Sequence, residues 1–158
     1  METFLKRIPF SLFCVLMTLA ALIPSSVIYY LSQYIFSLLF DDISKYSPPQ
    51  LTISVESVLG TVVFAPVFET LILVAVIYFL QAIISKKIWI YLISAVFFGV
   101  LHGLTGALWF FGTVWSFFVF TYCFLLWSSE NSLKAFLAAC IPHMLLNSVA
   151  CLILFSSS

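Results

Sequence analysis

The chain has 158 residues, of which 64% are hydrophobic and only 8% are charged. A soluble domain of this size needs more charged and polar surface to face water, so the composition excludes one. The formal net charge is zero and no block of basic residues is present, which argues against binding to nucleic acid. Apolar runs longer than about 18 residues recur, and each could cross the hydrocarbon of a bilayer.

In hydrocarbon, only helices and closed barrels satisfy their own backbone hydrogen bonds. The apolar runs lack the alternation over about ten residues that is typical of barrel strands. The sequence therefore predicts an all-α fold, a polytopic transmembrane bundle of about five membrane-crossing helices.

Residues 1–50 are predicted to form an N-terminal signal-anchor helix and an extracytoplasmic loop. Lys6 and Arg7 precede apolar sequence from Ile8 to Phe40, as in a signal peptide, but no convincing small-x-small cleavage site follows, which favours a retained anchor. A straight helix of that length would measure about 50 Å, more than a bilayer needs. We therefore expect a break near Pro24 or a second short helix along the interface. The charges and paired prolines at 41–50 predict a loop.

Residues 51–158 are predicted to form the functional core, with helices at 54–84, 88–103, 105–127 and 133–155. A tight turn at Lys86-Lys87 and a polar loop at 128–132 separate three of them. If every helix crosses, five of the six cations fall on one side, and Lys45 alone falls on the other. The positive-inside rule makes the side with the five cations, and with the N-terminus, the cytoplasm. These five are Lys6, Arg7, Lys86, Lys87 and Lys134.

Glu69 and His102 lie deep inside two consecutive predicted helices. A membrane carboxylate costs several kcal/mol unless it is protonated or paired, so its presence needs a reason. The two residues are almost equidistant from the Lys86-Lys87 turn. In an antiparallel hairpin both side chains would then lie at one level, about 22 to 25 Å from the turn.

A second aligned pair, His143 and Asn147, shares one face of the last helix because the residues are i and i+4. Gly99-x-x-x-Gly103 brackets His102 and allows close helix approach there. A lone membrane histidine is more often a packing residue, and an asparagine can simply join two helices. Two aligned pairs of costly residues favour a shared site. The cysteines lie in apolar runs without C-x-x-C spacing and are interpreted as free thiols used as small hydrophobes: Cys14, Cys123, Cys140 and Cys151.

Three motifs on separate predicted helices resemble those of the CAAX-protease and bacteriocin-processing (CPBP, or Abi) family of glutamic intramembrane proteases, over about residues 57–155. The family motifs are Glu-Glu-x-x-x-Arg, Phe-x-x-x-His and His-x-x-x-Asn. The chain has Glu69 at the first glutamate, then Phe98-x-x-x-His102, then His143-x-x-x-Asn147. By this resemblance Phe98 is a supporting residue of the site.

The first motif differs, because Thr70 and Val74 stand where the family has its second glutamate and its arginine. Those positions are i and i+4, so in the family they can form an ion pair within the helix. Here both partners are absent together, and replacing a buried pair as a unit is often close to neutral. We therefore interpret Thr70 and Val74 as supporting positions and Glu69 as the catalyst.

The resemblance implies a glutamate-dependent intramembrane endopeptidase without a cofactor. Glu69 would act as general base on a water held jointly with His102, and His143 and Asn147 would donate hydrogen bonds to the oxyanion. The expected partners are the lipid bilayer and a peptide or protein substrate, prenylated or with a hydrophobic tail, with no nucleic acid. Family members cleave prenylated tails, process bacteriocin leaders or confer immunity, and the predicted location is the bacterial inner (cell) membrane.

Two alternatives stay open. A zinc site could use Glu69, His102 and His143 as ligands with one open position, although the sequence lacks a His-Glu-x-x-His helix and Asn147 would have no role. A catalytically degenerate immunity or interaction protein could keep the same fold, as the residues at 70 and 74 favour and the other motif residues oppose. A small transporter is disfavoured because no inverted repeat or broken helix pair is present.

Overall fold

The computed structural model describes residues 2–49 and 54–156, which form helices and short connections. A short helix α1 (Glu2–Arg7) precedes α2 (Phe10–Leu39), and a 3-10 turn η1 (Ile43–Tyr46) follows. The next helix is continuous and consists of α3 (Val55–Leu59), a π-helical segment η2 (Gly60–Phe64) and α4 (Ala65–Ile83). The last three helices are α5 (Lys87–Gly103), α6 (Ala107–Trp127) and α7 (Ser132–Ser156).

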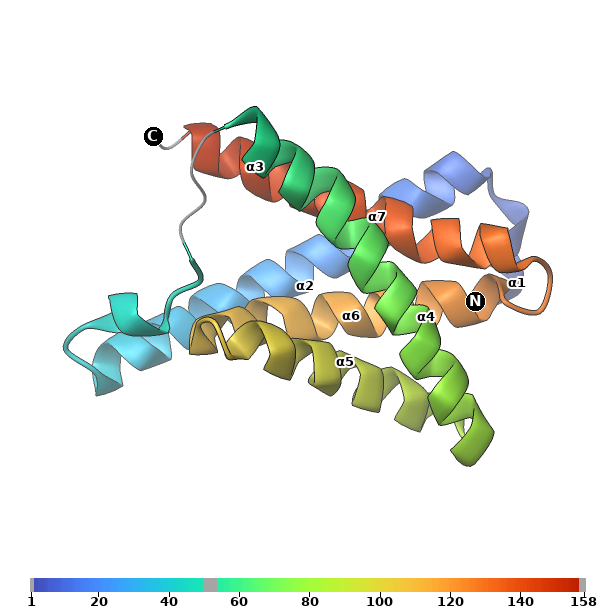
Figure 1. Ribbon diagram of the computed structural model, residues 1–158, viewed down its shortest axis with the longest axis horizontal. Helices are drawn as coiled ribbons and strands as arrows, with labels where there is room; N and C mark the ends of the chain where they lie inside the picture. The colour runs from blue at the N-terminus through green and yellow to red at the C-terminus, as the bar shows by residue number, and fades with distance from the viewer. Residues whose placement is uncertain (1, 50–53, 157–158) are drawn as a thin grey trace.

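Four of these helices are long and apolar enough to cross a membrane, namely α2, the continuous α3–α4 helix, α6 and α7. Helix α5 is also apolar but has only 17 residues, which gives it a length of about 25 Å. Figure 1 shows α5 running beside α6 along the bundle. The predicted all-α, polytopic bundle of about five crossing helices is confirmed.

Helix α6 is the centre of the bundle, since it packs against α2, α5 and α7. The α3–α4 helix crosses the other helices obliquely in Figure 1 and contacts α7 and α5. Most side chains in the second half of α6 are buried, and they join residues of the neighbouring helices in one core. Representative core residues are Phe13, Leu73, Phe98, Phe117, Phe124 and Ala139.

The two glycines that bracket His102 face α6. A Cβ atom at Gly99 would lie 3.0 Å from the ring of Phe110, and one at Gly103 would lie 3.1 Å from the Cβ of the same residue. The close approach expected beside His102 is therefore made by the Phe110 side chain, which occupies the space that the missing side chains leave.

The break expected near Pro24 is absent, and that prediction was wrong, because α2 runs through this residue as one helix. Pro24 has no N–H, so the Ala20 carbonyl loses its helical donor. The indole nitrogen of Trp115 in α6 donates to that carbonyl oxygen at 2.9 Å. An unpaired carbonyl in hydrocarbon costs several kcal/mol, and the bond from α6 removes this cost and lets the helix continue.

Charged side chains gather where α1 meets the α6–α7 connection. The Lys6 ammonium lies 2.7 Å from a carboxylate oxygen of Glu130, and Lys134 Nζ lies 3.6 Å from the centre of the Trp127 ring. The hydrogen bond from Lys6 lowers the pKa of the Glu130 carboxyl. In Figure 1 the α4–α5 turn lies at this same end, and η1 lies at the opposite end.

At the opposite end, the segment after η1 packs on the α5–α6 turn. Gly106 has φ 178° and ψ 117°, an extended conformation open to any residue. A Cβ atom there would nevertheless collide with the Ser47 carbonyl oxygen and lie 3.1 Å from the Pro48 nitrogen. Gly106 is therefore required for space, and it attaches this segment to the turn that follows His102.

The Gly106→Ala substitution is expected to lower the melting temperature in detergent, because the added methyl group must displace the Ser47 carbonyl at an overpacking cost of about 1–3 kcal/mol. Gly60→Ala is the matched control, since nothing lies within 4 Å of its added Cβ, and it should be neutral or stabilising by up to about 1 kcal/mol. Equal melting temperatures for both variants would contradict the packing of this segment on the turn.

Candidate active site

Three ionisable side chains from three helices meet in the interior. The Oε2 atom of Glu69 (α4) lies 3.7 Å from Nε2 of His102 (α5) and 3.5 Å from Nε2 of His143 (α7). The side chains are 25%, 14% and 6% exposed, respectively. The expected alignment of Glu69 and His102 is therefore present, and His143 joins them.

The hydrogen-bond partner of His102 fixes which ring nitrogen carries its hydrogen. Nδ1 lies 2.8 Å from the Phe98 carbonyl oxygen, which can only accept, so Nδ1 is the donor. In the neutral ring, Nε2 then presents a lone pair toward Glu69. The ring of Phe98 is buried and stacks on Phe117 with centroids 4.2 Å apart. Phe98 thus holds the histidine through its carbonyl and anchors α5 on α6.

His143 has the opposite arrangement. Its Nδ1 is buried and has no hydrogen-bond partner among the residues that the structure describes, whereas its Nε2 faces Glu69. A buried N–H without an acceptor is costly, so the hydrogen belongs on Nε2. One imidazole therefore offers a lone pair to the region around Glu69 Oε2, and the other offers an N–H.

Aromatic side chains of α6 support both imidazoles. The ring of His143 stacks on Phe120 with centroids 4.7 Å apart. The centroid of Phe117 lies 5.4 Å from those of both histidines, and Trp109 packs edge-on against His102 at 4.9 Å. Sequence reasoning did not single out these three residues. Their spacing on one helix was the available signal, but it does not stand out in a chain with 18 Phe.

Asn147 is placed differently from the other predicted site residues. Its amide nitrogen donates to the backbone carbonyl of Thr61, in η2, at 2.9 Å. This bond joins α7 to the helix that carries Glu69. It uses one of the two amide hydrogens. The structure therefore brings three of the four side chains face to face and attaches the fourth to the backbone beside them.

The positions that depart from the family motif are accommodated without charge. Thr70 is 1% exposed and lies close to the thiol of Cys140 in α7. Val74 is partly buried against the core. Position 70 thus makes a small polar contact with α7, and position 74 makes an apolar contact with the core.

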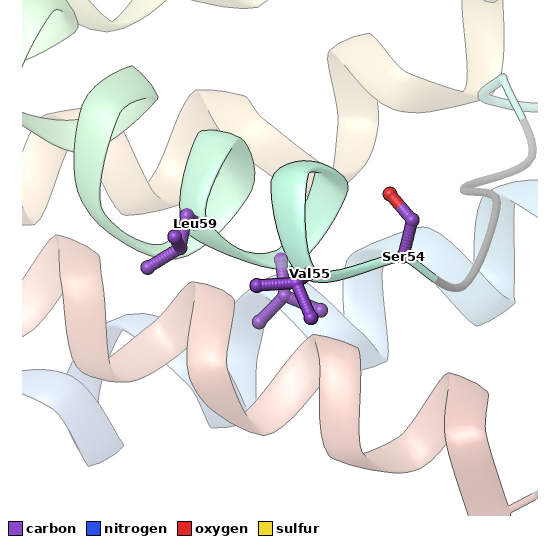
Figure 2. A pocket seen from close by; sticks show the side chains of 4 residues that line it. Ser54, Val55 and Leu59 are labelled. Atoms are coloured by element: carbon purple, nitrogen blue, oxygen red, sulfur yellow. The ribbon is translucent and has the colours of Figure 1, made fainter.

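The described residues form no metal-binding group at this centre, and a hollow at the start of α3 does not include it. Within the described ranges 2–49 and 54–156, no group of three or more His, Cys, Asp or Glu side chains is arranged to hold a metal ion. A mostly apolar hollow of about 410 Å³ lies at the start of α3 (Figure 2) and is lined by Ser54, Val55, Val58 and Leu59. Its lining includes none of the predicted site residues.

The fold and the site define a polytopic α-helical membrane protein with a partly buried centre of one carboxylate and two imidazoles. Such groups at these distances are suited to moving a proton to or from a water molecule.

Residues 51–149 match the family model described as type II CAAX prenyl endopeptidase, Rce1-like. The match spans more than half of the chain, and the protein belongs to this family of proteases. The resemblance seen in the three motifs is thereby confirmed, and the matched range contains all four predicted site residues. No curated protein and no solved structure matches the chain.

The Thr70→Glu substitution is expected to lower the melting temperature in detergent, because it places an unpaired carboxylate at a fully buried position, at a cost of about 3–5 kcal/mol. Adding Val74→Arg should recover part of that loss, since the two positions are one helical turn apart. The native protein, both single variants and the double variant are compared. Additive losses without recovery would show that the two side chains do not pair.

Proposed function

We propose that the protein is a glutamate-dependent intramembrane endopeptidase that cleaves a prenylated or otherwise hydrophobic peptide or protein tail. The proposal is carried by two imidazoles that both face one carboxylate oxygen through Nε2, whereas only the Nδ1 of His102 has a hydrogen-bond partner among the described residues. Membership of a CAAX prenyl endopeptidase family supports both the reaction and the class of substrate.

Glu69 and His102 activate the water. Their facing atoms, Oε2 and Nε2, are both acceptors and lie 3.7 Å apart, too far for a direct hydrogen bond but suitable for one bridging water. That water donates one hydrogen to each atom and directs an oxygen lone pair at the substrate carbonyl. Glu69 then takes the proton as general base and later passes it to the leaving amine.

His143 stabilises the oxyanion in this scheme. Its Nε2 atom lies 3.5 Å from the Glu69 oxygen, so the N–H is directed at the region where the tetrahedral intermediate forms. A buried donor held by aromatic rings is already oriented before the reaction, which is what makes such donors effective. The contact with Phe120 keeps the ring from turning away.

Replacing Glu69 with Gln should reduce cleavage of a farnesylated peptide with a C-terminal CAAX-type tail by about 10²- to 10⁴-fold, because the general base is lost. The assay uses the purified protein in lipid vesicles and a fluorogenic peptide with and without its farnesyl group. Glu56→Gln is the matched control, since Glu56 is an exposed carboxylate at the start of the same helix, and it should cleave at the native rate.

Three outcomes would change this assignment. Equal activity of the native protein and the Glu69→Gln variant would remove the glutamate from the mechanism. Inhibition by phenanthroline that added zinc reverses would favour the metal-dependent alternative. No cleavage of either peptide, or of a hydrophobic unprenylated tail, would favour an immunity or interaction protein of the same fold.

We further propose that the N-terminus lies in the cytoplasm of a bacterial cell and that the site opens toward the outer face. The cations at the α1 end and the α4–α5 turn support this orientation through the positive-inside rule. His102, at the far end of α5 from that turn, supports the outward opening.

Cysteine labelling with a membrane-impermeant maleimide tests the orientation on a background in which the four native cysteines are replaced. Lys45→Cys should react in intact cells, and Lys86→Cys should react only after the cells are opened. Both side chains are exposed in the structure, so a difference in reactivity reports the side of the membrane. The reverse pattern would turn the site toward the cytoplasm and favour a cytosolic prenylated substrate.

A further inference from the structure

The π-helical segment before α4 leaves one carbonyl without a helical donor. The N–H of Ala65 donates to the Gly60 carbonyl rather than to Thr61, its α-helical partner. In the π pattern the next donor along the chain would be residue 66, which is Pro66 and has no N–H. The Thr61 carbonyl therefore receives a hydrogen bond neither from its α-helical donor, residue 65, nor from its π-helical donor, residue 66.

Asn147 supplies the missing donor from α7, with its amide nitrogen 2.9 Å from the Thr61 carbonyl oxygen. The same solution occurs at Pro24, where Trp115 of α6 donates to the Ala20 carbonyl that the proline leaves unpaired. Because an unpaired carbonyl in hydrocarbon costs several kcal/mol, each bond stabilises a helix that contains a proline and fixes it to a neighbour.

We infer that Asn147 is a positioning residue, which orients Glu69 by holding η2 in its π form rather than by touching the reacting atoms. A π segment adds one residue to a turn, and one residue corresponds to a rotation of about 100° around the helix. Glu69 follows Pro66 within one turn. Its direction toward the two histidines therefore depends on that added residue.

The test is a double-mutant cycle of Asn147→Ala and Pro66→Ala, because an alanine at position 66 restores a backbone N–H beside the Thr61 carbonyl. Asn147→Ala alone should lower the melting temperature in detergent and lower kcat on the farnesylated peptide, with little change in KM. In the Pro66→Ala background, the same substitution should cause less than half of each loss. The kinetic part rests on the proposed function, and the thermal part does not.

Two results would overturn the inference. If Asn147→Ala lowered kcat as much in the Pro66→Ala background as in the native protein, Asn147 would act at the reacting atoms, as an oxyanion donor. If Asn147→Ala lowered the melting temperature as much in the Pro66→Ala background as in the native protein, the Thr61 carbonyl would not need the Asn147 amide as its donor. If the native protein cleaves no peptide, the proposed function fails while the thermal cycle still tests the inference.

The cycle has a matched control and a second measurement. Trp115→Phe with Pro24→Ala should show the same non-additive melting temperatures without a change in kcat, since these residues lie outside the site. If Pro66→Ala fails to fold, infrared spectra of protein with ¹³C-labelled threonine carbonyls replace it. Asn147→Ala should then move one carbonyl band to higher wavenumber, and unchanged spectra would overturn the inference.

Discussion

A carbonyl buried in hydrocarbon needs a donor, and the prolines in this bundle remove donors that the helices would otherwise supply. Trp115 reaches from α6 to the backbone of α2, and Asn147 reaches from α7 to the backbone of the helix that carries Glu69. Each of these bonds supplies the donor that a helix carbonyl lacks, and it also fixes that helix to its neighbour. A hydrogen bond between Ser25 and Ser116, 2.8 Å long, adds a second polar contact between α2 and α6. The placement of the site helices thus depends on hydrogen bonds to backbone carbonyls as well as on apolar packing.

Helix α6 supports the site with aromatic surfaces and contributes no reactive group to it. Phe117 contacts both imidazoles, and Phe120 stacks on one of them. The aromatic rings offer no strong competing acceptor. The hydrogen of His102 therefore goes to the nitrogen beside the Phe98 carbonyl, and that of His143 goes to the nitrogen that faces Glu69. The asymmetry between His102 and His143 therefore results from one backbone carbonyl on α5 and from the lack of a described partner for Nδ1 on α7.

The helix boundaries, the alignment of Glu69 with His102 and the family could all be predicted from the sequence, since they depend on local hydropathy, on spacing along one hairpin and on short motifs. The continuity of α2 through Pro24 could not, because its donor Trp115 is 95 residues from Ala20. The partner of Asn147 is also remote, at 86 residues. Such bonds leave no periodic signal, and a proline alone predicts a break. The aromatic residues of α6 that support the histidines could not be singled out either, because phenylalanine is frequent throughout the chain.

The uncharged residues Thr70 and Val74 have a consequence for biogenesis. Within α4, Glu69 is the one formally charged side chain, whereas a helix with the full family motif would carry a second carboxylate and a guanidinium into the bilayer. Each charged side chain near the centre of a helix adds about 2.5–3.5 kcal/mol to the free energy of insertion by the translocon. The α3–α4 helix is long and apolar enough to cross a membrane, so it can leave the translocon as an independent segment. It need not wait for α7 to emerge from the ribosome and pair with it.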